Sequence, residues 1–389
     1  MTQEHVERPS VEEMLDHAAR RRICVVIGAA GWGKTTAVAA WSRSRPTAWL
    51  RYEDHLGDAD RLLTNLFGAL LPHASAPASI RGTAAVGTEL IGSHVEAICV
   101  WLLSFLSECL SKDIILVLDD LHRLQPSSDA SGIVESLCRQ APDRLHLVLI
   151  SRCELPLSLH RLRGRGHVAE IHAPDLAFDV ADVGALLRKT VGQDPIGLSR
   201  RLWERTGGWP AAVHSAVEML QKAEPDQRLA AVERLCRPGE RFHGYLAEEV
   251  VGAAPGWIQQ LLRTLAIFGE VRSTMEIARG LNDPTTVLAE LSRQGLVRRT
   301  GRDTGWALVR PLQDFFEYEP TPSASERKVL RVTAATECLN RGAPDEALRY
   351  LLAAGEYAAC AQLLIDHGDA MVQQGQLDAV LKAAELPAE

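Results

Sequence analysis

Nine consecutive residues near the start of the sequence have the types and spacing of a phosphate-binding loop. They match the pattern G-x-x-x-x-G-K-[ST] and read Gly28-Ala29-Ala30-Gly31-Trp32-Gly33-Lys34-Thr35-Thr36. Their glycines permit backbone angles closed to other residues, so successive N–H groups can surround phosphate oxygens at a helix N-terminus. Lys34 would contribute a positive charge to the β- and γ-phosphates, and the Thr35 hydroxyl would bind Mg²⁺. We therefore expect these nine residues to bind ATP or ADP with Mg²⁺.

Two adjacent acids follow the apolar run at residues 114–118. This pattern is typical of a central strand that ends at the carboxyl edge of a sheet, where ligands bind in open α/β folds. We expect Asp119 to be the carboxylate on the metal side. Asp120 is the candidate for orienting or deprotonating an attacking water. The alternative for Asp120 is a cap on the turn that follows it.

A basic residue follows a third apolar run, Leu145–Ile150, after Ser151. Arg152 could face the γ-phosphate and report its presence. It could equally pair with Asp119 or Asp120, and the sequence leaves both options open.

These residues require a sheet that brings several strand ends together. Residues 23–27 are a β-branched run typical of a strand buried on both faces, and a helical pattern follows the glycine loop. Strands and helices alternate from 20 to 172. The sequence predicts an α/β P-loop NTPase domain over residues 1–175, with a parallel sheet and helices on both faces.

The sequence becomes helical after residue 175, and we expect a small all-α domain over 176–238. Within it, Gly207 and Gly208 would end one helix and Pro210 would start the next. That role is sufficient to explain these residues. Because they follow a nucleotide domain, Trp209 and Pro210 could also form a flat apolar surface for adenine.

Residues 239–320 read as helices followed by two short strands around a glycine-bounded turn, which suggests a winged-helix domain. Nine arginines against ten acids over 240–318 leave this region close to neutral. DNA contact requires a basic face, so a packing or switch module is favoured. Residues 321–389 are Ala-rich and helical, with the alternation of small and large residues typical of the start of a TPR-like α-solenoid.

Composition excludes several broad classes of protein. The net charge of −8 creates no general attraction for DNA or an anionic membrane. Eight scattered cysteines form no C-x-x-C pair, which favours reduced thiols in a cytoplasmic protein. The start of the sequence does not resemble a secretory leader, and the most apolar helical stretch, 97–106, is too short to span a bilayer. We expect no membrane partner.

The order of these motifs resembles the STAND ATPases, in particular the MalT-like branch of large LuxR-family transcriptional regulators. The resemblance spans nearly the whole chain. Its matching segments are 28–36, 48–50, 116–122, 149–152, 206–210, 245–250 and 347–364.

The resemblance implies a switch in which ADP maintains a closed monomer. ATP and a small-molecule or protein inducer would open the chain into a homo-oligomer that regulates transcription, and slow hydrolysis would reset it. Lys34, Thr35 and Asp119 would bind Mg-ATP. Arg152 would sense the γ-phosphate, and Pro210 would lie against adenine.

Two departures from the family pattern affect what can be carried over. The family's winged-helix motif usually ends in a His that reaches the phosphates, whereas this sequence has Arg310, which could still contact a phosphate. A long repeat sensor and a C-terminal helix-turn-helix are not found in these residues, so we expect no direct DNA binding by this chain.

Two other functions compete with the switch. One is a continuously cycling ATPase or phosphotransferase, which would need an acceptor site that the sequence does not indicate. The other is an interaction scaffold in which the nucleotide is structural. Under the leading interpretation the chain is a weak ATP hydrolase at most.

Overall fold

The computed structural model describes residues 8–53, 59–73, 95–192, 197–271, 283–300, 305–319, 324–340 and 342–373. The residues group into two compact units, one formed by 1–233 with 293–295 and the other by 234–292 with 296–389. Among the described residues, no helix is both long and apolar enough to cross a membrane.

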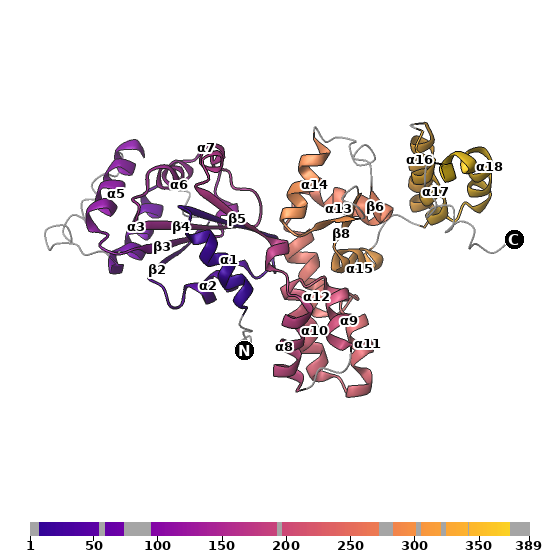
Figure 1. Cartoon of the computed structure of the whole chain (residues 1–389), viewed down its shortest axis with the longest axis horizontal. Coiled ribbons are helices and arrows are strands. Elements are labelled where there is room, and N and C mark those ends of the chain that lie inside the picture. Colours follow the sequence, from indigo (N-terminus) through magenta and orange to yellow (C-terminus); the bar gives the residue numbers. More distant parts are fainter. Residues whose placement is uncertain are drawn as a thin grey trace. The chain divides into compact units, whose positions relative to one another are not determined.

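The first unit is built on a five-stranded parallel sheet (Figure 1). The strands are β1 (Ile23–Ile27), β2 (Thr47–Arg51), β3 (Ile114–Asp119), β4 (Leu145–Ser151) and β5 (Val168–His172). Their spatial order is β2-β3-β4-β1-β5, so β3, β4 and β1 are internal. Each of their runs is almost entirely aliphatic, as expected for strands covered on both faces. The predicted parallel sheet is confirmed.

Alternate side chains of β1 enter two separate cores because successive residues of a strand face opposite ways. Ile23, Val25 and Ile27 join one apolar cluster, and Cys24 and Val26 join the other. The helices that supply these clusters are α1 (Pro9–Ala19), α2 (Lys34–Ser42), α3 (Ala59–Leu70), α5 (Val95–Cys109) and α6 (Asp129–Gln140). The clusters show that helices α1 and α2 cover one face and α3, α5 and α6 the other.

A group of helices follows the sheet within the same unit. After α7 (His160–Gly164) and the short turn η5 (Ala173–Leu176), it consists of α8 (Val180–Val191), α9 (Leu198–Thr206), α10 (Pro210–Lys222) and α11 (Arg228–Glu233). Gly207 ends α9 in a left-handed conformation, and Pro210 is the first residue of α10. These two local roles agree with the sequence prediction.

The second unit combines helices with a small antiparallel sheet. Its first elements are α12 (Arg241–Tyr245), η7 (Leu246–Val251), α13 (Gly256–Phe268), β6 (Glu270–Val271), α14 (Pro284–Arg293), β7 (Val297–Thr300), β8 (Gly305–Leu308) and α15 (Arg310–Tyr318). The sheet order is β6-β8-β7, and β7 pairs with β8 as the predicted hairpin. The winged-helix assignment itself stays a prediction.

Three further helices end the described part of this unit. They are α16 (Ala324–Asn340), α17 (Pro344–Ala354) and α18 (Tyr357–Gln373). Their shared core contains small residues such as Ala335 and Ala347 next to large ones such as Leu348 and Tyr350. The predicted alternation of small and large side chains therefore serves helix packing, and the TPR-like assignment stays a prediction.

The adjacent residues Gly207 and Gly208 allow a test of the packing between α10 and the segment before α8. Both have positive φ, 60° and 72°. A Cβ on Gly208 would lie 2.2 Å from the backbone oxygen of Phe178, whereas a Cβ on Gly207 would meet nothing within 4 Å. Gly207→Ala should cost only about 1–2 kcal/mol of backbone strain, and Gly208→Ala should cost at least about 2 kcal/mol more.

Urea unfolding followed by tryptophan fluorescence measures both losses. Equal losses for the two variants would show that the close approach to Phe178 does not constrain position 208.

Candidate functional site

The glycine-rich loop connects β1 to α2 in the order that the sequence predicts. Gly31 and Gly33 adopt positive φ of 79° and 73°, and Gly33 is the N-cap of α2. No side chain caps this helix, so the amides of its first turn remain available to an anion. The loop is fixed from outside as well, because the N–H of Ala211 donates to the Gly31 oxygen at 3.0 Å.

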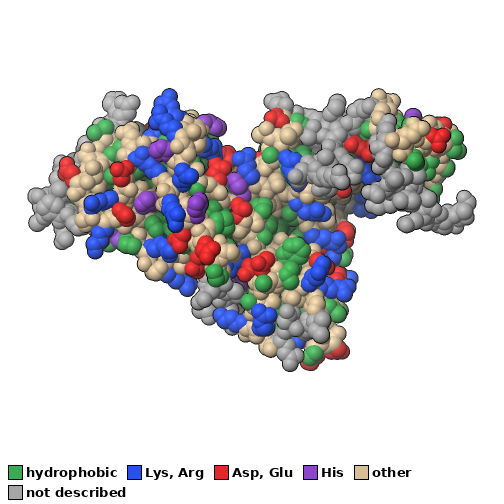
Figure 2. All heavy atoms as spheres, viewed as in Figure 1, with side chains coloured by type: hydrophobic (Ala, Val, Ile, Leu, Met, Phe, Trp, Pro, Cys, Tyr) green, Lys and Arg blue, Asp and Glu red, His purple; other side chains and the backbone are tan. Residues whose placement is uncertain are grey.

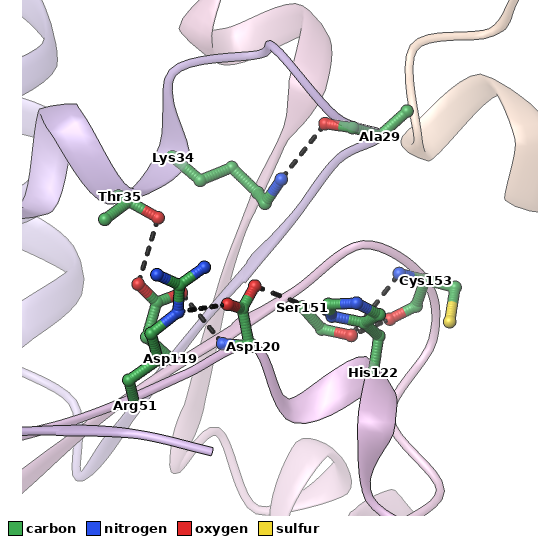
Figure 3. A network of polar contacts seen from close by, with 9 residues as sticks. All are labelled: Ala29, Lys34, Thr35, Arg51, Asp119, Asp120, His122, Ser151 and Cys153. Carbon is green, nitrogen blue, oxygen red and sulfur yellow. Dashed lines mark hydrogen bonds and ion pairs between the residues drawn. The ribbon is translucent and has the colours of Figure 1, made fainter. Parts of the chain in front are cut away.

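Lys34 is buried at the start of α2, with an exposed fraction of 9%. Its Nζ donates to the backbone oxygen of Ala29 at 3.0 Å (Figure 3). Burial, together with the charge of Arg152, lowers the pKa of Lys34 to about 8, and the charge of Asp119 opposes the shift. A phosphate group next to Nζ would compensate the ammonium charge that burial now disfavours.

The two residues predicted to bind Mg²⁺ lie together. The Thr35 hydroxyl donates to Oδ2 of Asp119 at 3.0 Å. Asp119 is buried, and burial raises the pKa of its carboxyl, while the Asp120 N–H and the Thr35 hydroxyl oppose the increase. The Thr35 hydroxyl at the start of α2 and the Asp119 carboxylate at the end of the internal strand β3 are oxygen ligands of the kind that Mg²⁺ prefers.

Asp120 has a left-handed backbone, with φ of 59° and ψ of 31°. Its N–H donates to Oδ1 of Asp119 at 2.8 Å. Its carboxylate makes no capping bond to the following turn, η4 (Leu121–Arg123), so the cap alternative is wrong. The carboxylate instead forms an ion pair with Arg51, with 2.6 Å between Nε and Oδ2.

Arg51 is a site residue that the sequence reading missed. It is the last residue of β2 and lies opposite Asp119 in the parallel register. The signal was present as a basic residue at the end of an apolar run, but only the pairing of β2 with β3 places it beside the two acids.

Arg152 lies near the loop lysine and His122, since its charge lowers the pKa of both. It follows β4, where Ser151 fixes the turn by donating its hydroxyl to the Cys153 oxygen at 2.5 Å. The backbone oxygen of Ser151 accepts a hydrogen bond from the Gly28 N–H at 3.2 Å, which links the end of β4 to the glycine loop. The predicted contact of Arg152 with a γ-phosphate is compatible with this position.

The Trp32 and Trp209 rings stack on each other, with centroids 5.3 Å apart and planes inclined by 10°. Trp209 is fully buried, and a Cβ on Gly33 would lie 3.6 Å from the Pro210 ring. This packing joins the glycine loop to the start of α10. The contacts of Trp209 and Pro210 with adenine stay predictions.

Arg310 belongs to the second unit, where its Nε lies 2.9 Å from Oδ1 of Asp314. Asp314 has an exposed fraction of 0%. The ion pair joins the first turn of α15 to a buried carboxylate, and a contact between Arg310 and a phosphate stays a prediction.

The residues of the loop and the strand ends fit a magnesium nucleotide. Two glycines with positive φ, a buried amine and a hydroxyl–carboxylate pair converge at the N-terminus of one helix. When bound, Mg²⁺ would neutralise phosphate charge. Lys34 would bind the phosphates, and Asp119 and Thr35 would supply the metal ligands.

His122 provides a pH test of this electrostatic environment. Burial, together with the charge of Arg152, lowers its pKa to about 4. Between about pH 6.5 and pH 4 the unfolded chain therefore binds a proton that the folded chain does not, and stability must fall as pH decreases. Relative to His122→Gln, the wild-type free energy of unfolding should fall by about 2 kcal/mol between pH 7 and pH 5.

Chemical denaturation of both proteins at the two pH values measures this difference. A difference that does not change with pH would show that His122 titrates normally in the folded protein.

A family model described as an AAA ATPase domain matches residues 7–150. The HTH-type transcriptional regulator MalT of Vibrio cholerae is 25% identical over 389 residues, covering 97% of this chain and 42% of that protein. This chain therefore spans less than half the length of that relative.

Two solved structures extend the comparison. A STAND protein with a tetratricopeptide repeat sensor from Pyrococcus horikoshii aligns with 93% of this chain and 50% of its own, at 17% identity and a TM-score of 0.42. A Walker-type ATPase of Pyrococcus abyssi aligns with 81% of this chain and 96% of its own, at 12% identity and a TM-score of 0.52, which shows a shared fold. The likeness to MalT runs along almost the whole sequence rather than the P-loop alone, so the chain is similar to the MalT-like STAND ATPases, and its residues 7–150 match an AAA ATPase domain.

Proposed function

We propose that this chain is a nucleotide-controlled switch in transcription regulation. ATP or ADP with Mg²⁺ binds at the glycine loop, and the bound nucleotide sets the chain's tendency to self-associate. The observation that supports this most directly is the buried Lys34 beside the pair formed by Thr35 and Asp119. Burying an ammonium group without a counter-charge costs free energy, and a bound phosphate would supply that counter-charge.

Within this proposal, each site residue has a defined task. Gly28 to Thr36 and Lys34 bind the phosphates, and Thr35 and Asp119 bind Mg²⁺. Asp120 orients the attacking water in a slow hydrolysis that resets the switch. Arg152 senses the γ-phosphate, and Pro210 supports the adenine ring.

A switch also needs two conformations that the nucleotide contacts differently. We assign the response to the predicted small helical, winged-helix-like and TPR-like regions at 176–238, 239–320 and 321–389, with Arg310 as a further phosphate contact. A small-molecule or protein inducer would bias the same equilibrium, and the active form would be a homo-oligomer in the cytoplasm.

DNA is not a partner that this chain's charge favours. The net charge is −8. Basic and acidic side chains are interspersed on the face of the first unit drawn in Figure 2. Non-specific DNA binding needs a concentration of Lys and Arg, so a transcriptional role would be exerted through protein partners of this chain.

Removal of the loop lysine tests the proposal. Wild-type protein should bind Mg-ADP and Mg-ATP in calorimetry, and its mass in light scattering should increase with a non-hydrolysable ATP analogue but not with ADP. Lys34→Ala should weaken binding of either nucleotide by at least about 100-fold, because a charged phosphate contact is lost. Lys222→Ala, at an exposed position on α10, should behave as wild type.

Folded wild-type protein that gives no heat with either nucleotide would contradict the binding proposal. Binding without a nucleotide-dependent change in mass would contradict the switch and favour a structural nucleotide. Turnover on the order of 1–100 s⁻¹ would instead favour a cycling ATPase or phosphotransferase.

A further inference from the structure

The parallel pairing of β2 with β3 determines where Arg51 lies. It ends β2, and the register places it opposite Asp119 at the end of β3. The N–H of the next residue, Tyr52, donates to the backbone oxygen of Asp119 at 2.8 Å, so the pairing of β2 with β3 continues to the strand ends. The backbone therefore directs Arg51 to the edge of the sheet that carries the glycine loop.

One nitrogen of the Arg51 guanidinium is already fixed by Asp120. Nε lies 2.6 Å from Oδ2 of Asp120. Asp120 in turn is fixed through its own N–H, which donates to Asp119. A guanidinium carries five N–H donors in a planar fork, so this contact leaves the two amino groups with donors to spare.

In Figure 3 these amino groups point to the side of the network on which Thr35 and Lys34 are drawn. The charge of Arg51 interacts with both Asp119 and Asp120. Among the described residues, its ion pair is with Asp120, and its side chain keeps an exposed fraction of 67%. The fork is therefore oriented by one carboxylate and accessible to a ligand.

A simple surface ion pair is the alternative role for Arg51. Such pairs contribute little to stability because water screens them. The pair of Arg139 with Glu135 on α6 has the same length, 2.6 Å, and similar exposure. Arg51 differs from Arg139 in its location, next to the carboxylate that Thr35 contacts.

We propose that Arg51 binds the terminal phosphate of a nucleoside triphosphate and that Asp120 positions it for this contact. The inference rests on the proposed nucleotide function and adds a residue to it. A planar fork matches phosphate oxygens in two-point contacts. Because a diphosphate lacks the γ-phosphate, Arg51 contributes to the difference between ATP and ADP that a switch requires.

The test compares Arg51→Met with Arg139→Met in the full chain. Calorimetry measures the affinities for a Mg-bound non-hydrolysable ATP analogue and for Mg-ADP. Arg51→Met should weaken binding of the analogue by about 10- to 100-fold and leave ADP binding within about two-fold, because one charged hydrogen-bonded contact is lost. Arg139→Met should change neither affinity.

Two further variants separate binding from structure. Arg51→Lys should restore only part of the affinity for the ATP analogue, because an ammonium retains the charge but not the fork. Asp120→Asn should also reduce the preference for ATP over ADP, because the Arg51 guanidinium loses the carboxylate that positions it. Thermal unfolding of each variant without nucleotide checks that the fold is retained.

The outcomes distinguish a failure of nucleotide binding from a failure of the role of Arg51. If wild-type protein binds neither nucleotide, the proposed function fails, and this inference fails with it. If wild-type protein binds both and Arg51→Met weakens both by the same factor, or neither, the proposed function stands and the role of Arg51 is overturned.

Discussion

The buried charge of Lys34 is the constraint on which the site depends. An amine with an exposed fraction of only 9% loses most of its hydration, and its pKa falls to about 8. Its Nζ is held by one backbone oxygen, that of Ala29, within the same loop. The loop must therefore keep its shape, and the stacked Trp32 and Trp209 rings together with the bond from Ala211 to Gly31 fix it from outside.

Parallel pairing explains why residues from four strands meet around this lysine. The carboxyl ends of all strands in a parallel sheet lie at one edge. This edge therefore brings together the last residue of β2 and the residues that follow β1, β3 and β4. The register sets them opposite one another, as Arg51 with Asp119 and Ile27 with Ser151. One topological feature thus positions the loop, the metal-side acid and two arginines.

The sequence predicted the parts of this site that depend on local order. The aliphatic runs that became β1, β3 and β4 are each bounded by polar or glycine residues, and their ends differ from the prediction by no more than one residue. The sequence did not predict the partner of Asp120, because Arg51 is 69 residues away and becomes adjacent only through strand order. The same holds for the stack of Trp32 on Trp209 and for the close approach of Gly208 to Phe178. Both join residues that are far apart in the sequence and become neighbours only in the folded chain.

The charges at the site differ from the net charge of the whole chain, and the charges at the site determine which ligand it attracts. The chain carries a net charge of −8, whereas three cations, Lys34, Arg51 and Arg152, lie beside Asp119 and Asp120 at the sheet edge. His122 adds no charge at neutral pH, because burial and Arg152 lower its pKa to about 4. Dissolved salt at about 0.1 M screens exposed charges that are more than about 10 Å apart, so an entering ligand responds to these neighbouring charges more than to the distant acids. A magnesium-bound polyphosphate satisfies both sets of charges at once, with the metal beside the acids and the phosphates beside the cations.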